Sequence, residues 1–268
     1  HNYLFYKYIF IYLLDINPKL IIMKKKTLFY YALFAITLVS AQDLFIVKSG
    51  DLYGILNNDG IEILRPTYHS IENFGLIKKD WAKVEFDGKF GFINKEGEVV
   101  VHLKYDDLGV FGEYEESLLK INLLGKYGFI DKSGDVVTPP IYDSLGNFGN
   151  FHKDWSLVSQ NNLFGFVDKS GKVVFEPKYD LIEQFDVYKK GWARINENGK
   201  FGFISREGRV VVRPKYISIN NFNEYRKGWA RVSVENNKFG FINSDGKEVV
   251  PTVYDNVEVF KKKTPADQ

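Results

Sequence analysis

Short segments with an aromatic–glycine–aromatic centre recur along the chain. The stretch "KFGFINKEG" at residues 89–97 returns as "KYGFIDKSG", "LFGFVDKSG", "KFGFISREG" and "KFGFINSDG". In an extended strand, Phe90 and Phe92 point to one face, while Gly91 and Ile93 point to the other. Apolar groups on both faces predict a sheet that is covered on both sides. We expect the glycine to leave a notch that receives an aromatic ring of a neighbouring sheet.

The residues around this segment predict three further short strands. In the second copy, "WAKVEF" precedes Asp87-Gly88, a dipeptide typical of a two-residue hairpin turn. After "KFGFIN" and a glycine-containing turn come "EVVVHLKY" and "DDLGVF". No segment has the apolar spacing of a helix. Each copy is therefore predicted to be an antiparallel meander of four strands.

The pattern has a nearly constant period of 37 residues. Three residue types keep the same step, which lengthens to 38 at the last copy. These are the glycines Gly54, Gly91, Gly128, Gly165, Gly202 and Gly240, the phenylalanines Phe74, Phe111, Phe148, Phe185, Phe222 and Phe260, and the tyrosines Tyr68, Tyr105, Tyr142, Tyr179, Tyr216 and Tyr254. Such self-similarity is the mark of a repeat architecture. We expect one all-β domain of six repeats at residues 43–268.

The ends of the repeat array suggest how the sheets are arranged. The first copy begins with "DLFIVK" and has no preceding Tyr-Asp strand, whereas the last copy ends with that strand, "YDNVEVF". The last strand would complete the first sheet, so the sequence favours a closed six-bladed β-propeller. An open β-repeat stack is the alternative, although such stacks usually carry polar caps.

The first 42 residues are predicted to lie outside this domain. The segment "MKKKTLFYYALFAITLVSAQ" at residues 23–42 has the basic start, the short apolar run and the small residues of a secretory signal peptide. We interpret residues 1–22, upstream of the only methionine, as non-native upstream translation. The protein is therefore expected to be exported, to a periplasmic, cell-surface or secreted location.

Charge and composition narrow the range of functions. Without the five Lys and one Asp of residues 1–42, 31 basic and 33 acidic residues remain, so the domain is nearly neutral. A nucleic-acid partner therefore has no support from net charge. The absence of cysteine excludes disulfides and thiolate metal sites. We expect no stable membrane insertion once the signal peptide is removed.

Candidate catalytic residues are few. The predicted domain has three histidines, His69, His102 and His152, at three different positions of the repeat. They are too scattered for a zinc site or for Ser-His-Asp catalysis. Adjacent acids such as Asp106-Asp107 are typical of solvated turns. We predict no catalytic residue, no metal ligand and no cofactor.

One loop of each repeat has the character of a binding surface. It lies between the repeated Phe and the Trp or Leu that opens the next strand, as in "GLIKKD", "GNFHKD", "DVYKKG" and "NEYRKG". Its third residue is apolar, and two basic or imidazole side chains follow in four copies, while Glu115-Glu116 breaks the pattern. We expect these loops to form a basic, aromatic-dotted rim with the turns that carry Lys95, Lys132, Lys169 and Arg206. The candidate binding residues are Lys78, Lys79, Phe151, Lys153, Tyr188, Lys189, Lys190, Tyr225, Arg226 and Lys227.

The repeats resemble the WG-repeat family of bacterial proteins. The resemblance rests on the aromatic-glycine-aromatic strand, the Asn or Asp turn with glycine, and a "P-x-Y-D" stretch that is present here as "PPIYD" and "EPKYD". The family's Trp-Gly pair appears as Phe-Gly or Tyr-Gly, so this chain resembles a divergent member. The resemblance implies an interaction module and transfers no catalytic residue.

These observations favour an exported, non-enzymatic binding scaffold. Its basic rim would contact an anionic polysaccharide, an envelope surface or an acidic protein. The alternative is a propeller enzyme, a hydrolase or lyase, with its site in the central channel. Convergent carboxylates in such a channel would distinguish the two.

Overall fold

The computed structural model describes residues 44–257. The predicted signal peptide and the predicted upstream translation, residues 1–42, lie outside the described residues. So do the last three residues of the last predicted strand, 258–260, which include Phe260. Within the described range, no helix is long and apolar enough to cross a membrane.

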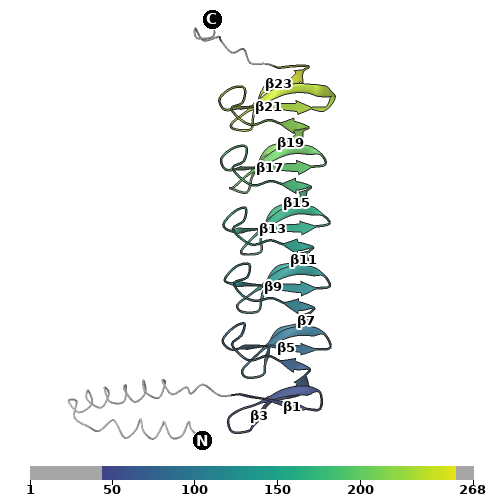
Figure 1. The fold of residues 1–268 in the computed structure, drawn as a ribbon, viewed down its shortest axis with the longest axis vertical. Coiled ribbons are helices and arrows are strands. Elements are labelled where there is room, and N and C mark those ends of the chain that lie inside the picture. The colour runs from purple at the N-terminus through teal and green to yellow at the C-terminus, as the bar shows by residue number, and fades with distance from the viewer. Residues whose placement is uncertain (1–43, 258–268) are drawn as a thin grey trace, which may run out of the picture.

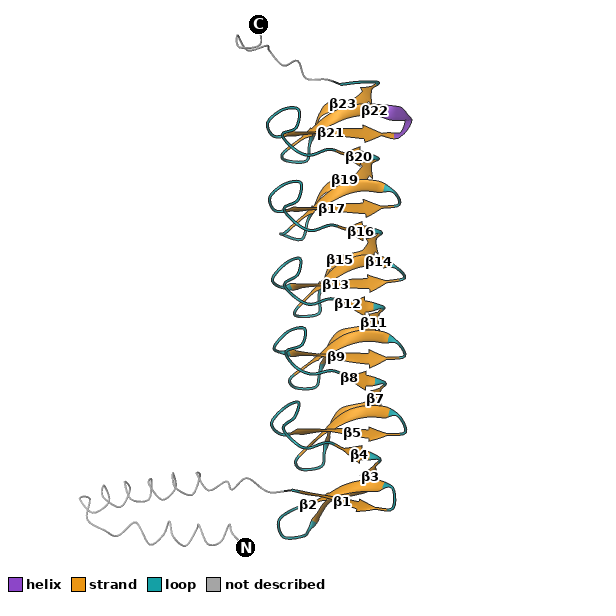
Figure 2. Ribbon diagram, in the orientation of Figure 1, coloured by secondary structure: helices purple, strands orange, loops and turns teal. Residues whose placement is uncertain are grey.

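The described residues form six antiparallel sheets, named A to F in chain order (Figure 2). Sheet A contains β1 (Phe45–Ser49), β2 (Leu52–Leu56) and β3 (Glu62–Tyr68). Sheet B contains β4 (Ser70–Ile71), β5 (Trp81–Phe86), β6 (Lys89–Asn94) and β7 (Val99–Tyr105). Sheet C contains β8 (Asp107–Leu108), β9 (Leu118–Leu123), β10 (Lys126–Asp131) and β11 (Val136–Tyr142).

The other three sheets repeat this order. Sheet D contains β12 (Ser144–Leu145), β13 (Trp155–Gln160), β14 (Leu163–Asp168) and β15 (Val173–Tyr179). Sheet E contains β16 (Leu181–Ile182), β17 (Trp192–Glu197), β18 (Lys200–Ser205) and β19 (Val210–Tyr216). Sheet F contains β20 (Ser218–Ile219), β21 (Trp229–Val234), β22 (Lys238–Asn243) and β23 (Glu248–Tyr254), with a short 3-10 turn, η1 (Glu235–Asn237), in its hairpin. The predicted all-β repeat of four-stranded meanders is confirmed.

The six sheets form an open row, not a ring. Sheets A and F lie at opposite ends of the stack (Figure 1). Sheet A has only three strands, so within the described residues no C-terminal strand completes it. The open β-repeat stack, the alternative of the sequence analysis, therefore describes the arrangement, and the favoured closed propeller does not. The physical reason is the angle at which neighbouring sheets pack, which displaces successive sheets along one axis instead of fanning them about a centre (Figure 1).

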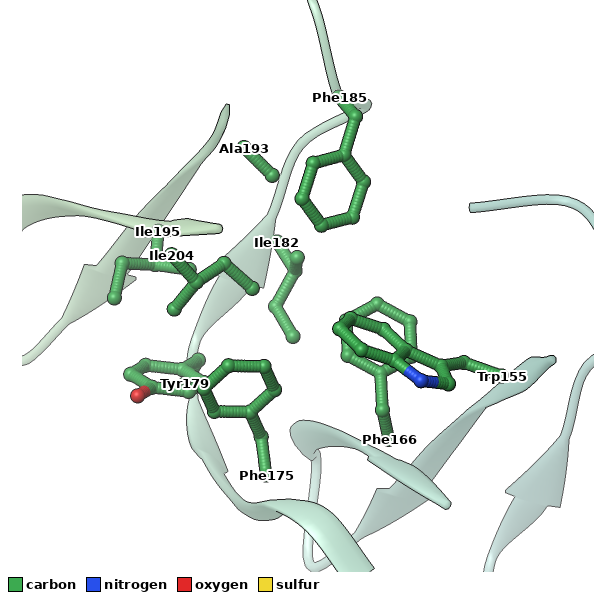
Figure 3. Packing of buried hydrophobic residues seen from close by; sticks show 9 residues of the cluster. All are labelled: Trp155, Phe166, Phe175, Tyr179, Ile182, Phe185, Ala193, Ile195 and Ile204. Carbon is green, nitrogen blue, oxygen red and sulfur yellow. The ribbon is translucent and has the colours of Figure 1, made fainter. Parts of the chain in front are cut away.

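The core consists of one apolar cluster at each contact between neighbouring sheets. Figure 3 shows the contact between sheets D and E. Sheet D contributes aromatic rings, among them Phe166 and Tyr179, and sheet E contributes smaller aliphatic groups, among them Ile195 and Ile204. All four of these side chains are fully buried. Each sheet thus has an aromatic face toward the next sheet and an aliphatic face toward the previous one.

The repeated glycine is required by its own sheet. In sheet B, Phe90 and Phe92 pair with Tyr105 and Val101, so the last strand, β7, bulges opposite Gly91. A Cβ on Gly91 would collide with the main-chain carbonyl oxygen of Val101. The predicted role of this glycine, a notch for a ring of the neighbouring sheet, was wrong. The backbone of β7 occupies the notch.

The Asp of the Tyr-Asp motif connects consecutive sheets. One carboxylate oxygen of Asp106 pairs with Lys89 in sheet B, and the other accepts the main-chain N–H of Leu124 in the hairpin of sheet C. Asp143 does the same with Lys126 and with the N–H of Asn161. The lysine hydrogen bond is the largest of the causes that lower the pKa of each carboxyl. These aspartates therefore fix the position of each hairpin relative to the preceding sheet.

Candidate functional site

The loops chosen from the sequence lie in a row along one side of the stack, opposite the hairpins (Figure 1). Each loop leads from the short first strand of a sheet into its second strand, as between β16 and β17. The turn between the third and fourth strands of the next sheet lies beside it. For example, Lys78 Nζ donates a hydrogen bond of 2.5 Å to the carbonyl oxygen of Lys132. We call this row of loops and turns, residues 75–80, 112–117, 149–154, 186–191 and 223–228 with the neighbouring turns, the rim.

Main-chain hydrogen bonds hold each rim loop in one shape. In sheet E, the N–H of Asp186 donates to the carbonyl of Trp192, and the N–H of Trp192 donates to the carbonyl of Lys189. The first loop residue has a positive φ in every copy, which explains why it is Gly, Asp or Asn. The carboxylate of Asp186 also accepts the N–H of Gly191 and pairs with Arg206, and these bonds, in this order of size, lower its pKa.

The aromatic residue of each loop turns inward. Phe151, Tyr188 and Tyr225 are half-buried, and each ring packs on a core phenylalanine of its own sheet. The ring centroids are 5.4 Å apart for Phe151 and Phe166, 6.0 Å for Tyr188 and Phe203, and 5.7 Å for Tyr225 and Phe241. These three residues anchor the loops. The structure does not bring them together into an exposed aromatic platform.

The first basic residue of each loop stacks on the tryptophan of the same copy. The cationic groups of Lys78 and Lys189 lie 4.1 Å from the ring centres of Trp81 and Trp192. Arg226 lies 4.2 Å from Trp229, and the ring centres of His152 and Trp155 are 4.4 Å apart. Where the sequence has Leu118 in place of Trp, the loop residue is Glu115. A basic or imidazole side chain therefore occurs at this position where a tryptophan stands three residues later to stack with it.

The second basic residue of each loop is exposed. Lys79, Lys153, Lys190 and Lys227 project from four of the five described loops, and Glu116 takes this place in sheet C. Lys153 has 82% of its side chain exposed and lies 3.8 Å from Asp154. Within the described residues, the other three lysines form no ion pair within 4 Å. These four lysines, together with the exposed Arg226, are the part of the candidate site that is available to a partner.

The basic residues of the neighbouring turns are largely neutralised. Lys95 pairs with Asp80 at 3.1 Å, Lys169 with Glu115 at 2.7 Å, and Arg206 with Asp186 at 2.6 Å. The rim therefore carries a smaller positive surplus than the sequence suggested. Sequence reasoning missed these pairs because the partners are 15 to 54 residues apart in the chain. It also missed the stacked base and tryptophan, although their constant spacing of three residues was a readable signal.

The histidines do not meet. His69 stacks on Phe86 with 4.6 Å between ring centres, and its Nδ1 accepts the N–H of Asp87. His152 lies on Trp155, and His102 is exposed on β7. The described residues contain no group of three or more His, Asp or Glu side chains that could hold a metal ion. Each histidine thus has a local packing role or faces solvent.

Comparison with known proteins identifies the repeat. The family model described as "WG containing repeat" matches residues 53–90, 90–126, 127–164, 164–201, 201–238 and 239–263. A search of curated proteins finds no match.

Several solved structures show weak similarity. Hsv2 of Kluyveromyces lactis is 11% identical over 83% of this chain and 80% of its own, with a TM-score of 0.26. BamB of Moraxella catarrhalis is 13% identical over 78% and 75%, also with a TM-score of 0.26. Apo AztD of Citrobacter koseri is 12% identical over 79% and 71%, with the same TM-score. The chain spans 65% of an Hsv2 form in which loop 6CD is replaced by a Gly-Ser linker. Scores this low do not establish a common overall arrangement.

Proposed function

The chain belongs to the WG containing repeat family, and we propose that this member is an exported, non-enzymatic binding scaffold. Its exposed rim lysines contact an extended anionic partner, for which an acidic polysaccharide is the best candidate. The observation that carries this proposal is the row of Lys79, Lys153, Lys190 and Lys227 along one side of an open stack. Export rests on the signal peptide expected at residues 23–42.

The straight row suits a partner with repeated charges. The four lysines recur at intervals of 37 residues or twice that number, one in each of sheets B, D, E and F. A linear polyanion that follows the rim can contact several of them at once, so weak single contacts add up to useful affinity. Stacked residues such as Lys189 hold the loops in one shape, which lowers the entropy lost on binding. Glu116 leaves a gap in the row at sheet C.

The enzyme alternative has less support. It places the site in a central channel, and the described sheets form a row without such a channel (Figure 1). The rim carboxylates that could act as acids or bases, Asp80, Glu115 and Asp186, are engaged in ion pairs. The proposal therefore assigns these acids a structural role.

Binding to immobilised polygalacturonate, with neutral dextran as reference, tests the proposal. We expect the chain to bind polygalacturonate alone, and more weakly as salt screens the exposed charges. A variant with Lys153→Glu, Lys190→Glu and Lys227→Glu should lose at least tenfold in affinity. The matched control carries Arg65→Glu, Lys104→Glu and Arg213→Glu, which change three exposed bases on the last strands of their sheets by the same total charge.

The outcomes separate the partner classes. Equal loss in both variants would mean that only net charge matters, and unchanged binding in the rim variant would overturn the rim assignment. Binding to anionic lipid vesicles or to an acidic protein, but not to polygalacturonate, would replace the polysaccharide by that partner.

A further inference from the structure

The two ends of the stack expose the two halves of one interface. Each contact between neighbouring sheets joins the aromatic face of one sheet to the aliphatic face of the next, and this contact occurs five times in the described chain. Sheet F has no following sheet and sheet A has no preceding one within the described residues. We propose that copies of this chain join head to tail, with sheet F of one copy packed on sheet A of the next.

The aromatic face of sheet F is partly open. Tyr254 is 49% exposed, whereas the tyrosine at this position in the other sheets is at most 6% exposed. Val250 is partly exposed, while its equivalent in sheet E, Val212, is 3% exposed. Trp229 is also less covered than Trp192. These are the groups that meet the following sheet elsewhere in the stack.

The aliphatic face of sheet A is open in the same way. Phe45 is 54% exposed, and Val47 and Leu56 are partly exposed. The residues at these three positions in the other sheets are fully buried. In sheet B they are Ala82, Val84 and Ile93. The face that lacks a preceding sheet is thus of the kind that sheet F would cover.

In the described chain, sheet A also lacks the short first strand of the other sheets. The sheet F end of another copy could supply it. In sheet B, the short strand β4 pairs with β5, with Ile71 opposite Val84. Within the described residues, β1 pairs with β2 alone. In the repeat register, Val257 corresponds to Ile71 and Val47 to Val84. An open edge strand is a template for pairing with another chain, so Val257 of one copy would pair with Val47 of the next.

The connecting aspartate of the last sheet forms one of the two bonds that Asp106 forms. Asp255 pairs with Lys238 at 2.6 Å, as Asp106 pairs with Lys89. Asp106 also accepts a main-chain N–H from the hairpin of the following sheet. No second bond of this kind is formed by Asp255 within the described residues. In the repeat register, the N–H of Gly50 in the next copy would supply it.

These three features select a second copy as the occupant. The apolar faces, the strand edges and the aspartate bond of the two ends are complementary. They match in the same register as the contacts between neighbouring sheets within the chain. Because opposite ends meet, the contact is heterologous, and a straight stack does not close on itself. The assembly is therefore a filament in which the rim continues from copy to copy.

Blocking one end at a time tests the proposal. Val47→Lys blocks the sheet A end, Tyr254→Lys blocks the sheet F end, and Leu124→Lys, at an 80% exposed hairpin position, is the control. The proteins are purified from cells that express the full chain, and their mass is measured by sedimentation velocity over a range of concentrations. We expect the wild type and the control to grow with concentration beyond two copies, and each blocked variant to remain a single copy.

Mixing the two blocked variants gives the sharpest result. Each retains one intact end, so an equimolar mixture should form particles of two copies and none larger. An unfolded variant could not produce this gain, so folding failure is not mistaken for blocking. A wild type that stays a single copy at every concentration, or a mixture that does not pair, would overturn the proposal. The variant with three rim lysines reversed should still assemble, which separates this result from that of the binding proposal.

Discussion

The ammonium nitrogen of Lys189 lies 4.1 Å from the centre of the Trp192 ring, on the rim of sheet E. The same contact joins Lys78 to Trp81 in sheet B. These bases were chosen from the sequence as binding residues, but the structure gives them a partner inside their own repeat. The lysine that follows, such as Lys190, is more exposed than the stacked Lys189.

The stacked pair should contribute measurably to stability. In a double-mutant cycle of Lys189→Gln and Trp192→Leu, we expect a coupling free energy of about 0.5–1 kcal/mol, the range of cation–π contacts near the surface. The cycle of Lys190→Gln with Trp192→Leu should give a coupling close to zero. Urea denaturation of the variants measures both. Equal coupling in the two cycles would show that the stacking has no specific value.

The loop tyrosine should behave as part of the core. Phe203 is fully buried, so Phe203→Ala should cost about 3–5 kcal/mol. Tyr188 is half-buried against Phe203 and has the Arg194 guanidinium 4.2 Å from its ring centre. Tyr188→Ala should therefore cost about 1–2 kcal/mol, more than an exposed substitution. Denaturant melts give both values, and a loss near zero for Tyr188→Ala would return this ring to the candidate binding surface.

The strand glycine should not tolerate even one methyl group. A Cβ on Gly165 would collide with the carbonyl oxygen of Phe175 in its own sheet, so we expect Gly165→Ala to cost at least about 3 kcal/mol. Gly146 in the same sheet is the control, because the nearest atom to its Cβ would be 3.4 Å away. Thermal unfolding compares the two variants. A mild effect of Gly165→Ala would mean that β15, the last strand of this sheet, can shift away.

The connecting aspartates should make stability fall in acid. Asp106 and Asp143 have pKa values below the ordinary 3.8, first because of the bonds from Lys89 and Lys126. The unfolded chain therefore takes up their protons at higher pH than the folded chain. Their contribution is complete above the unfolded pKa and is lost as pH falls from about 4 through the lower folded pKa.

Urea denaturation between about pH 6 and pH 2 measures this dependence. The double variant Asp106→Asn, Asp143→Asn should be less stable than the wild type at the upper end and should lose less stability on acidification. An unchanged acid slope would assign the dependence to other groups.

The sequence by itself determined the repeat and the sheet. The hairpin signal Asp87-Gly88 set the pairing of Val84 with Gly91, and the structure has that register. The recurrence of Tyr105 and its equivalents marks positions that face the same environment in every interior sheet, and these tyrosines are buried there. These properties are local or repeat-wide, so a pattern along the chain is sufficient to specify them.

Only the tertiary structure decided whether the sheets form a row or a ring and which charges of the rim are neutralised. Row and ring use the same strands and the same apolar faces, and they differ in the angle between neighbouring sheets, which many side chains of each interface fix together. The neutralisation of Lys169 by Glu115 depends on that angle too, because it joins a turn of one sheet to a loop of another. Contacts between sheets thus neutralise charges that no single repeat encodes, whereas pairs such as Lys95 with Asp80 form within one sheet.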